Sequence, residues 1–347
     1  MKKRFLYIGI AAATVVGCTE KSDFVTQEPA ADLLTVTVSA SSEGAAQSRV
    51  ALTENEDGGL KATWADENET LGAWSSAAST FAKFTMVAGS LSTNNESASF
   101  VGENPNGTMR LVHPYVESAA ISAEGIFTAD VANQAIDITA DGGLSSLRGS
   151  TYMVSESFES SESVVPSMSQ LGAVVEVGLR FSGLAAGSTY QITKLLVGGN
   201  SGINLPTQAL INLNKEEPAE MVVTEQAGTI TAEVSGSPII GNYADNSLTY
   251  SIHFNTFAFD LPSDGQIMLG VELTNEESQR ESIVYKITNN SASAYAFGVA
   301  SYTAINYFCS VEVVAGGSIG DWGELDQSTD LSLSEYDGAM SIPLKRL

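Results

Sequence analysis

Short runs that alternate apolar and polar residues fill most of this chain, and they limit its possible folds more than any other feature. In the run from Val174 to Phe181, for example, Val175, Val177 and Leu179 fall on one face. A period of two residues is that of a half-buried β-strand, and the 3.6-residue period of an amphipathic helix is nearly absent. Gly, Asn, Asp and Ser separate the runs and favour turns. The sequence therefore predicts an all-β protein made of β-sandwiches.

The length of 347 residues is enough for two domains, each with its own core. A Ser/Glu-rich segment that contains Pro166 is the best linker candidate. We therefore predict an N-terminal sandwich at residues 50–165 and a C-terminal sandwich at residues 166–347. The stretch Pro206–Pro218 could form either a short helix or a strand. The clearest predicted strands are Leu60–Trp64, Phe81–Val87, Ser97–Val101, Met109–His113, Ala135–Thr139, Thr151–Ser155, Val174–Phe181, Gln191–Val197, Leu210–Leu213, Thr229–Val234, Leu248–Phe259, Ile267–Leu273, Ser282–Thr288 and Thr303–Val314.

The first seventeen residues have the pattern of a bacterial lipoprotein signal peptide. Three basic residues, Lys2 to Arg4, precede an apolar run from Phe5 to Val16 that is too short to span a bilayer. Small apolar residues then lead to Cys18. A cleaved secretory signal without lipid is the alternative, but it leaves this cysteine unexplained. We therefore predict removal of residues 1–17 and acylation of Cys18, for example with palmitate. Acylation would anchor the protein, because two acyl chains hold a protein stably on a membrane.

The only other cysteine is Cys309, so a lipidated Cys18 leaves no internal disulfide. Cys309 lies in an alternating run, where a buried structural thiol is more common than a reactive one.

Residues 18–49 contain a strand followed by a tether. In the segment from Leu33 to Ser39, the inward face would carry Leu34, Val36 and Val38. A run of small polar residues follows and ends at Arg49, the only basic residue between Lys21 and Lys61. The pattern indicates an exchangeable strand that a protease could release by cutting between Arg49 and Val50. The other interpretation is that Arg49 begins the first strand of the sandwich.

Motifs for catalysis and cofactor binding are weak. Gly316–Gly320 matches G-x-S-x-G, but both histidines, His113 and His253, come earlier in the chain and no helix pattern follows. The acidic clusters Glu54–Asp57 and Asp66–Glu69 do not have the ligand spacing of a calcium loop. No phosphate-binding or dinucleotide-binding motif is present. We predict that the protein is not an enzyme and has no cofactor or dedicated metal site; whether the acidic loops bind calcium is open at the level of sequence.

The net charge argues against two classes of binding partner, and the aromatic residues suggest one. With 16 Lys and Arg against 41 Asp and Glu, the formal net charge of −25 argues against nucleic-acid binding and against electrostatic binding to anionic lipids. Some aromatic residues could form a sugar-stacking surface, although they more often fill cores. These residues are Trp64, Trp74, Tyr115, Tyr243, Tyr295 and Trp322.

Several motifs follow one another along the chain: the lipobox at Cys18, Ser48-Arg49, Trp64 followed by Leu71-Gly72-Ala73-Trp74, Phe100-Val101-Gly102, His113-Pro114-Tyr115, and the strand Val174–Phe181 after Ser169–Ala173. In this order they resemble the fimbrillin-like lipoproteins of Bacteroidales. Two positions depart from the family pattern, which has Thr or Ala in place of Val50 and a Gly-Asp turn in place of Ala65–Glu69.

This resemblance implies two β-sandwich domains of transthyretin-like topology and a structural role in surface fimbriae, or pili, that serve cell adhesion. It further implies export to the cell outer membrane as a lipoprotein and cleavage by an arginine-specific protease. A C-terminal strand of another fimbrial subunit would then replace the lost strand by donor strand exchange. Two segments could be the donor: one with Leu331 and Leu333, the other with Met340, Ile342 and Leu344.

Other functions remain open at the level of sequence. A surface lipoprotein could bind a glycan or a host ligand through exposed loops and never polymerise. An anchored hydrolase is a third and weaker reading. Arg49 distinguishes the fimbrial subunit from the monomeric surface lipoprotein, because a monomer has no use for a severable strand. The place of the subunit in a fibre, as stalk, tip or anchor, is also open.

Overall fold

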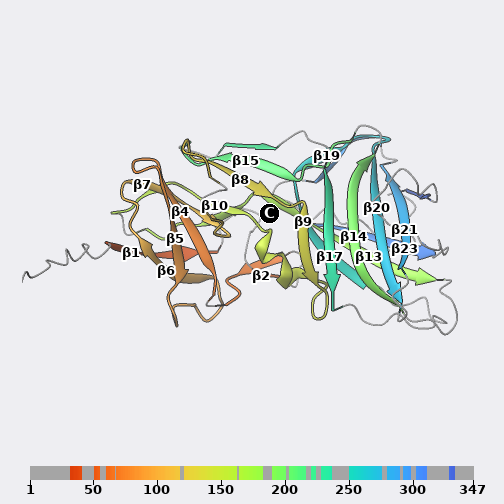
Figure 1. The fold of residues 1–347 in the computed structure, drawn as a ribbon, viewed down its shortest axis with the longest axis horizontal. Helices are drawn as coiled ribbons and strands as arrows, with labels where there is room; N and C mark the ends of the chain where they lie inside the picture. Colours follow the sequence, from red (N-terminus) through yellow and green to blue (C-terminus); the bar gives the residue numbers. More distant parts are fainter. Residues whose placement is uncertain are drawn as a thin grey trace, which may run out of the picture. The chain divides into compact units, whose positions relative to one another are not determined.

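The computed structural model confirms that the protein is all-β (Figure 1). Among the residues that the structure describes, the one helical element is the 3-10 helix η2, Leu144–Gly149. The described residues are 32–40, 51–54, 60–66, 68–117, 121–161, 164–182, 190–200, 203–215, 220–223, 228–236, 250–275, 280–289, 292–297, 302–310 and 328–332.

An eight-stranded sheet carries the first part of the chain (Figure 1). Its inward side chains form one core, which includes Leu71, Phe84, Phe100 and Leu111. Trp64, which precedes β4, belongs to the same core, and all five side chains are fully buried. The strand order is β1-β6-β5-β4-β7-β10-β12, with β11 also pairing with β7. The strands are β1 (Leu33–Ser39), β4 (Thr70–Ser75), β5 (Thr80–Met86), β6 (Ser97–Glu103), β7 (Thr108–His113), β10 (Met153–Ser155), β11 (Phe158–Glu159) and β12 (Met168–Gln170).

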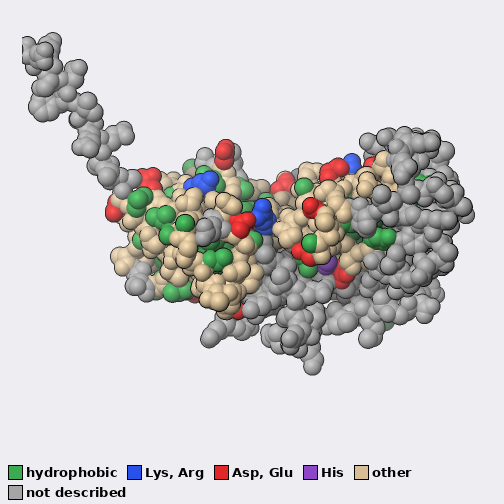
Figure 2. All heavy atoms as spheres, turned by 90° about the horizontal axis from the view of Figure 1, so that it is seen from below, with side chains coloured by type: hydrophobic (Ala, Val, Ile, Leu, Met, Phe, Trp, Pro, Cys, Tyr) green, Lys and Arg blue, Asp and Glu red, His purple; other side chains and the backbone are tan. Residues whose placement is uncertain are grey.

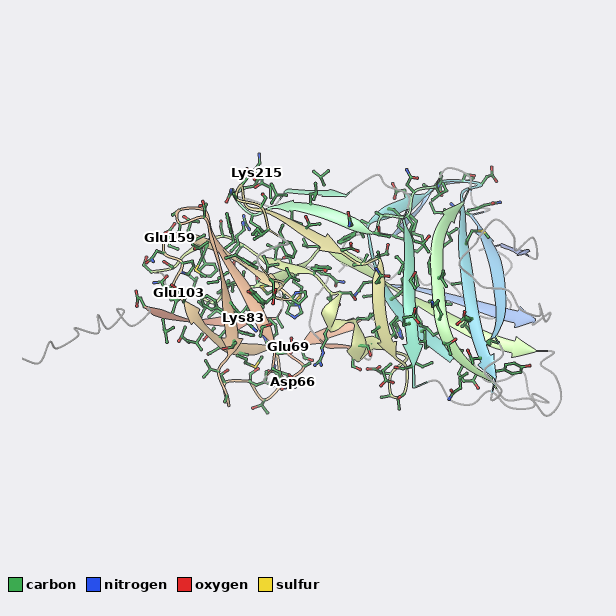
Figure 3. All side chains as sticks on the ribbon, in the orientation of Figure 1. Asp66, Glu69, Lys83, Glu103, Glu159 and Lys215 are labelled. Carbon is green, nitrogen blue, oxygen red and sulfur yellow. The ribbon has the colours of Figure 1, made fainter. Side chains whose placement is uncertain are left out.

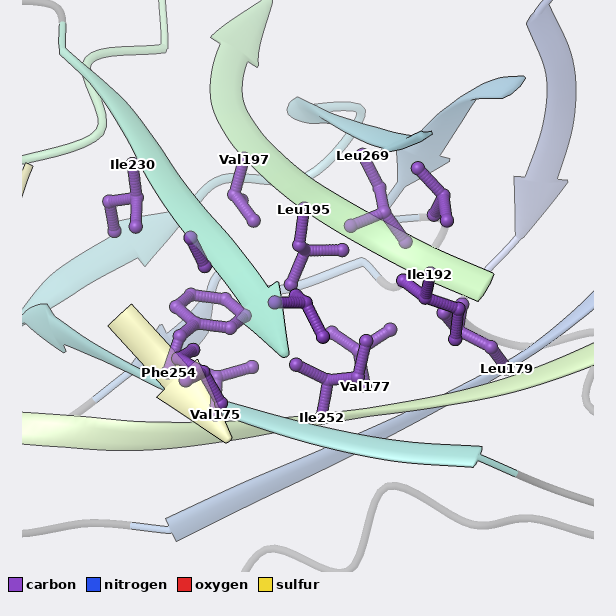
Figure 4. Close-up of a cluster of buried hydrophobic side chains, with 14 of the residues drawn as sticks. Val175, Val177, Leu179, Ile192, Leu195, Val197, Ile230, Ile252, Phe254 and Leu269 are labelled. Atoms are coloured by element: carbon purple, nitrogen blue, oxygen red, sulfur yellow. The ribbon is translucent and has the colours of Figure 1, made fainter. Parts of the chain in front are cut away.

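The second part of the chain builds a sandwich of two sheets around a second core, which Figure 4 shows in close-up. Val177 and Ile252 from one sheet and Leu195 and Leu269 from the other belong to this core, as the alternation of each strand predicts. One sheet has the order β18-β13-β23 and the other β24-β21-β20-β14-β17-β9. These strands are β9 (Asn133–Asp137), β13 (Gly172–Ser182), β14 (Tyr190–Asn200), β17 (Thr229–Ser235), β18 (Tyr250–Phe257), β20 (Gln266–Asn275), β21 (Arg280–Thr288), β23 (Tyr302–Ser310) and β24 (Ser328–Ser332).

Two strands that precede residue 165 pair with strands of the second part. β8 (Ile126–Asp130) pairs with β15 (Gln208–Asn212), which also pairs with β16 (Glu220–Val223). β9 pairs in parallel with β17. Hydrogen bonding therefore crosses the predicted domain boundary at residues 165 and 166, and that boundary itself stays a prediction. Two further pairs complete the described strands: β2 (Ala51–Glu54) with β3 (Leu60–Thr63), and β19 (Phe259–Leu261) with β22 (Tyr295–Phe297).

A third core lies where these parts meet. Trp74 and Val112 from the eight-stranded sheet, Phe127 from β8, Ile211 from β15 and Phe257 from β18 belong to it. Trp74 donates its indole N–H to Asn214 Oδ1 at 2.7 Å, in the turn after β15. The two parts of the chain therefore share buried apolar surface as well as strand pairs.

The predicted strands agree with the structure at most positions. The ambiguous stretch Pro206–Pro218 contains strand β15 rather than a helix. β4 was not predicted, because five of its six residues are buried and the strand shows no clear alternation. The G-x-S-x-G segment and the cluster Glu54–Asp57, apart from Glu54, lie outside the described residues.

Candidate functional site

The predicted exchangeable segment forms β1, the edge strand of the eight-stranded sheet. β1 pairs antiparallel with β6, from Leu33 opposite Glu103 to Ser39 opposite Ser97. In Figure 3, the label of Glu103 marks the end of this strand pair. We use the term β1 groove for the surface that β1 covers: β6, Trp64 and the segment 166–167.

The inward side chains of β1 complete the first core. Val36 is 5% exposed and Val38 is fully buried, as is Ala40 just after the strand, while Leu34 packs partly buried against the same core. The opposite face is solvent-exposed, with Leu33 at 65%. The predicted inward face is therefore the one observed. By area, Val36 and Val38 together contribute roughly 3–6 kcal/mol to the first core, at roughly 1.5–3 kcal/mol for each side chain.

The backbone of β1 is held mainly along one edge. The bonds from Asn104 N to Asp32 O and from Ala40 N to Glu96 O, both 2.8 Å, show that the even-numbered residues bond to β6. The N–H and C=O groups of the odd-numbered residues therefore face away from β6. On that side the described residues supply a bond only at the end of the strand, from Ser39 N to Pro166 O at 3.0 Å. Leu33, Thr35 and Thr37 thus present an open sheet edge among the described residues.

A tryptophan holds β1 from the core side. Trp64 is fully buried, and its indole N–H donates to the carbonyl oxygen of Val38 at 3.3 Å. Its ring meets the ring of Phe100 edge-on, with centroids 4.9 Å apart. A buried N–H needs an acceptor, so Trp64 requires a strand carbonyl at this position of the groove.

Behind Trp64 lies a buried pair of titratable side chains. His113 Nε2 is 3.3 Å from Glu69 Oε2, and His113 Nδ1 is 3.1 Å from the carbonyl oxygen of Thr151. The rings of His113 and Trp64 are in edge contact, with centroids 6.1 Å apart. Sequence reasoning placed Glu69 in an acidic loop and gave His113 no role, because no local pattern brings together residues 44 positions apart.

The exposed end of the same loop has a separate electrostatic pair. The backbone N–H of Asn68 donates to the Asp66 carboxylate at 2.7 Å and lowers the pKa of that carboxyl group. Arg148, 3.1 Å away, lowers this pKa further. Figure 3 labels Asp66 and Glu69 at this turn. Both partners of the ion pair are about half exposed, so it contributes little to stability.

Most of the other predicted site residues lie outside the described part of the chain. Leu331 is the exception: it belongs to β24, which pairs in parallel with β21 and places Leu331 opposite Ile287. The residues outside the description are Cys18, Arg49, Val50, Leu333, Met340, Ile342 and Leu344.

The described aromatic candidates for sugar stacking are largely occupied by other contacts. Trp64 and Trp74 are buried. The Tyr115 ring stacks on Phe81, with centroids 5.5 Å apart, and the Lys83 ammonium lies 5.3 Å from its centroid. The side chains of Tyr243, Tyr295 and Trp322 lie outside the description.

Charged side chains are spread over the face shown in Figure 2 rather than gathered in one patch. Within the described ranges, no group of three or more His, Cys, Asp or Glu side chains is placed to hold a metal ion. No helix in those ranges is long and apolar enough to cross a membrane.

Fold and site together define an all-β protein in which the N-terminal strand β1 forms one edge of the eight-stranded sheet. No protein-family model matches the chain, and a search of curated proteins found no match. Solved structures that resemble it include a "putative cell adhesion protein" from Bacteroides ovatus, with 11% identity and a TM-score of 0.44, covering 83% of this chain and 97% of that one. A protein of the same description from Bacteroides fragilis has 13% identity and a TM-score of 0.41, covering 81% and 91%.

A fimbrial protein from Bacteroides ovatus is also similar, with 10% identity and a TM-score of 0.30, covering 78% of this chain and 52% of that one. The printed descriptions of these three similar structures are thus of two putative cell adhesion proteins and one fimbrial protein. The function of this chain has to be argued from its own residues.

Proposed function

We propose that this protein is the lipid-anchored precursor of a structural subunit of a surface fimbria, which serves cell adhesion. In this function, acylated Cys18 holds the precursor on the outer face of the outer membrane. An arginine-specific protease cuts after Arg49 and frees β1. A C-terminal strand of another subunit, carrying Leu331 and Leu333 or Met340, Ile342 and Leu344, then fills the β1 groove.

One observation carries this proposal: β1 supplies buried core side chains, yet within the described ranges its backbone forms a strand ladder along one edge and only an end contact, from Ser39 to Pro166, along the other. Val36, Val38 and Ala40 complete the first core, so an empty groove would expose apolar surface and strongly favour a replacement strand. Because β6 is the only described strand that forms a ladder with β1, exchange requires breaking one set of these ladder bonds rather than two. Exchange of a strand in the interior of the sheet would require breaking the ladders with both neighbouring strands.

A disulfide between β1 and β6 tests the exchange. The hydroxyl oxygens of Thr37 and Ser99 are 3.0 Å apart in a directly opposed pair whose backbones are not bonded to each other. Such pairs bring side chains closest together and suit a disulfide. The variant Thr37→Cys/Ser99→Cys, in a chain with Cys18→Ser and Cys309→Ser, therefore locks β1 onto β6 when it is oxidised.

After cleavage with an arginine-specific protease, the reduced variant is expected to form detergent-resistant ladders, and the oxidised variant is expected to stay monomeric. The matched control is Lys194→Cys/Glu233→Cys, an opposed pair between β14 and β17 whose side chains are 2.9 Å apart. It should assemble in both redox states. Equal assembly of the oxidised Thr37→Cys/Ser99→Cys protein would exclude exchange of β1. Failure of every cleaved protein to assemble would favour a monomeric surface lipoprotein that binds a ligand through its loops.

A further inference from the structure

The connection between β6 and β7 contains the only Asn-Gly dipeptide in the 347 residues, Asn106-Gly107. Both residues have a left-handed backbone conformation, with φ of 58° at Asn106 and 73° at Gly107. Asparagine and glycine are the residues that tolerate positive φ at two successive turn positions. Asn106 is exposed, so water reaches this turn.

An asparagine followed by glycine can react with its own backbone. The backbone nitrogen of the next residue attacks the carboxamide carbon of the side chain, a five-membered imide forms, and ammonia leaves. Glycine favours the attack because it has no side chain to crowd the nitrogen. In the part of the chain that the structure describes, the N–H of Gly107 has no acceptor, whereas its carbonyl oxygen accepts from Ser160 N at 3.0 Å. The attacking nitrogen is therefore not occupied by a hydrogen bond there.

The side chain of Asn106 is held less firmly than its backbone. Its Nδ2 donates to the carbonyl oxygen of Asn104 at 3.1 Å, in an exposed bond that contributes little to stability. The backbone carbonyl of Asn106 instead accepts from the hydroxyl of Ser75 on β4, a fully buried residue. The carboxamide thus stays at the surface while the turn is bonded to the sheet.

Asn95 provides a comparison within the same sheet. It also has a left-handed φ, of 59°. The residue that follows is Glu96, whose side chain crowds the backbone nitrogen, and the N–H of Glu96 donates to Asn94 Oδ1 at 3.4 Å. Left-handed backbone is therefore common to the two asparagines, and only Asn106 has an unhindered nitrogen after it.

We propose that Asn106 is a site of spontaneous deamidation in the folded protein. Gly107 N bonds to Asn106 Cγ, the bond from Cγ to Nδ2 breaks, and ammonia leaves with the proton from Gly107 N. Water then opens the imide at one of two bonds to the same nitrogen. Cleavage at Cγ gives aspartate, and cleavage at the former backbone carbonyl carbon gives isoaspartate. Each product carries one negative charge that asparagine lacks.

Both products change the turn. A carboxylate has no N–H, so the bond to the Asn104 carbonyl is lost. In isoaspartate, the main chain runs through the former side chain and is longer by one carbon atom, and the carbonyl that accepts from Ser75 becomes part of a carboxylate. Asn104 N donates to the carbonyl of Asp32, just before β1, so the modified turn adjoins the start of the exchangeable strand.

Tandem mass spectrometry of the uncut protein, kept folded in neutral buffer, tests the proposal without requiring any exchange of strands. We expect the peptide with Asn106 to gain the mass difference between a carboxamide and a carboxyl group, as two products that chromatography separates. The whole protein should shift by one negative charge on ion exchange, and Asn95 should stay unmodified. In the control Asn106→Gly, which suits the left-handed φ, this charge shift should be absent.

The same chain unfolded in guanidinium chloride shows what the folded turn does. Conversion of Asn106 in the unfolded chain but not in the folded protein would overturn the proposal, because the turn would then protect this residue. Conversion of Asn95 as fast as Asn106 in the folded protein would also overturn it. Should Asn106→Gly fail to fold, the comparison of Asn106 with Asn95 in the natural chain decides.

Discussion

At the scale of single residues, Trp64 links the exchangeable strand to the core. Its indole N–H has the Val38 carbonyl as acceptor, whereas the indole N–H of Trp74 bonds to Asn214 at the meeting of the two parts of the chain. Both indoles are buried, so substitutions of Trp64 and Trp74 can be compared directly, with only Trp64 bonded to β1.

Replacing Trp64 with Phe keeps an aromatic ring and removes the bond to β1. We expect the free energy of unfolding to fall by about 0.5–1.5 kcal/mol from the lost hydrogen bond, with an added packing loss from the smaller ring. The opening of β1, measured by hydrogen exchange, should become more frequent. Trp74→Phe should destabilise the protein comparably without affecting β1 selectively. Equal β1 protection in the two variants would show that the bond to Val38 is unimportant.

At the scale of elements, β1 contributes to stability through one face only. Val38→Ala removes two buried carbon atoms at about 0.8 kcal/mol each and leaves a cavity, so we expect a loss of about 2 kcal/mol in the free energy of unfolding. Thr35→Ala, on the exposed face, should change it by less than about 0.5 kcal/mol. Urea unfolding of both variants measures the difference. Equal losses would mean that the inward face of β1 does not stabilise the core.

At the scale of the whole molecule, shared strands and a shared core join the two parts of the chain. β8 and β9 pair with strands of the second part, and the third core combines residues from both. We therefore expect one cooperative unfolding transition in urea, with coincident curves from tryptophan fluorescence and far-UV circular dichroism. Two separate transitions would show that the two parts unfold independently. Phe257→Ala, in the third core, should lower the midpoint of the whole transition.

The sequence by itself determined the all-β class, the bounds of β1 from Leu33 to Ser39 and its buried face, because strand periodicity is a local property of consecutive residues. Only the tertiary structure decided which strands pair, such as β9 with β17. It alone brought Trp64 to Val38, 26 positions apart in sequence, and His113 to Glu69. Such contacts depend on the long-range placement of sheet edges and on the need of buried polar groups for partners, and neither leaves a periodic trace in the sequence.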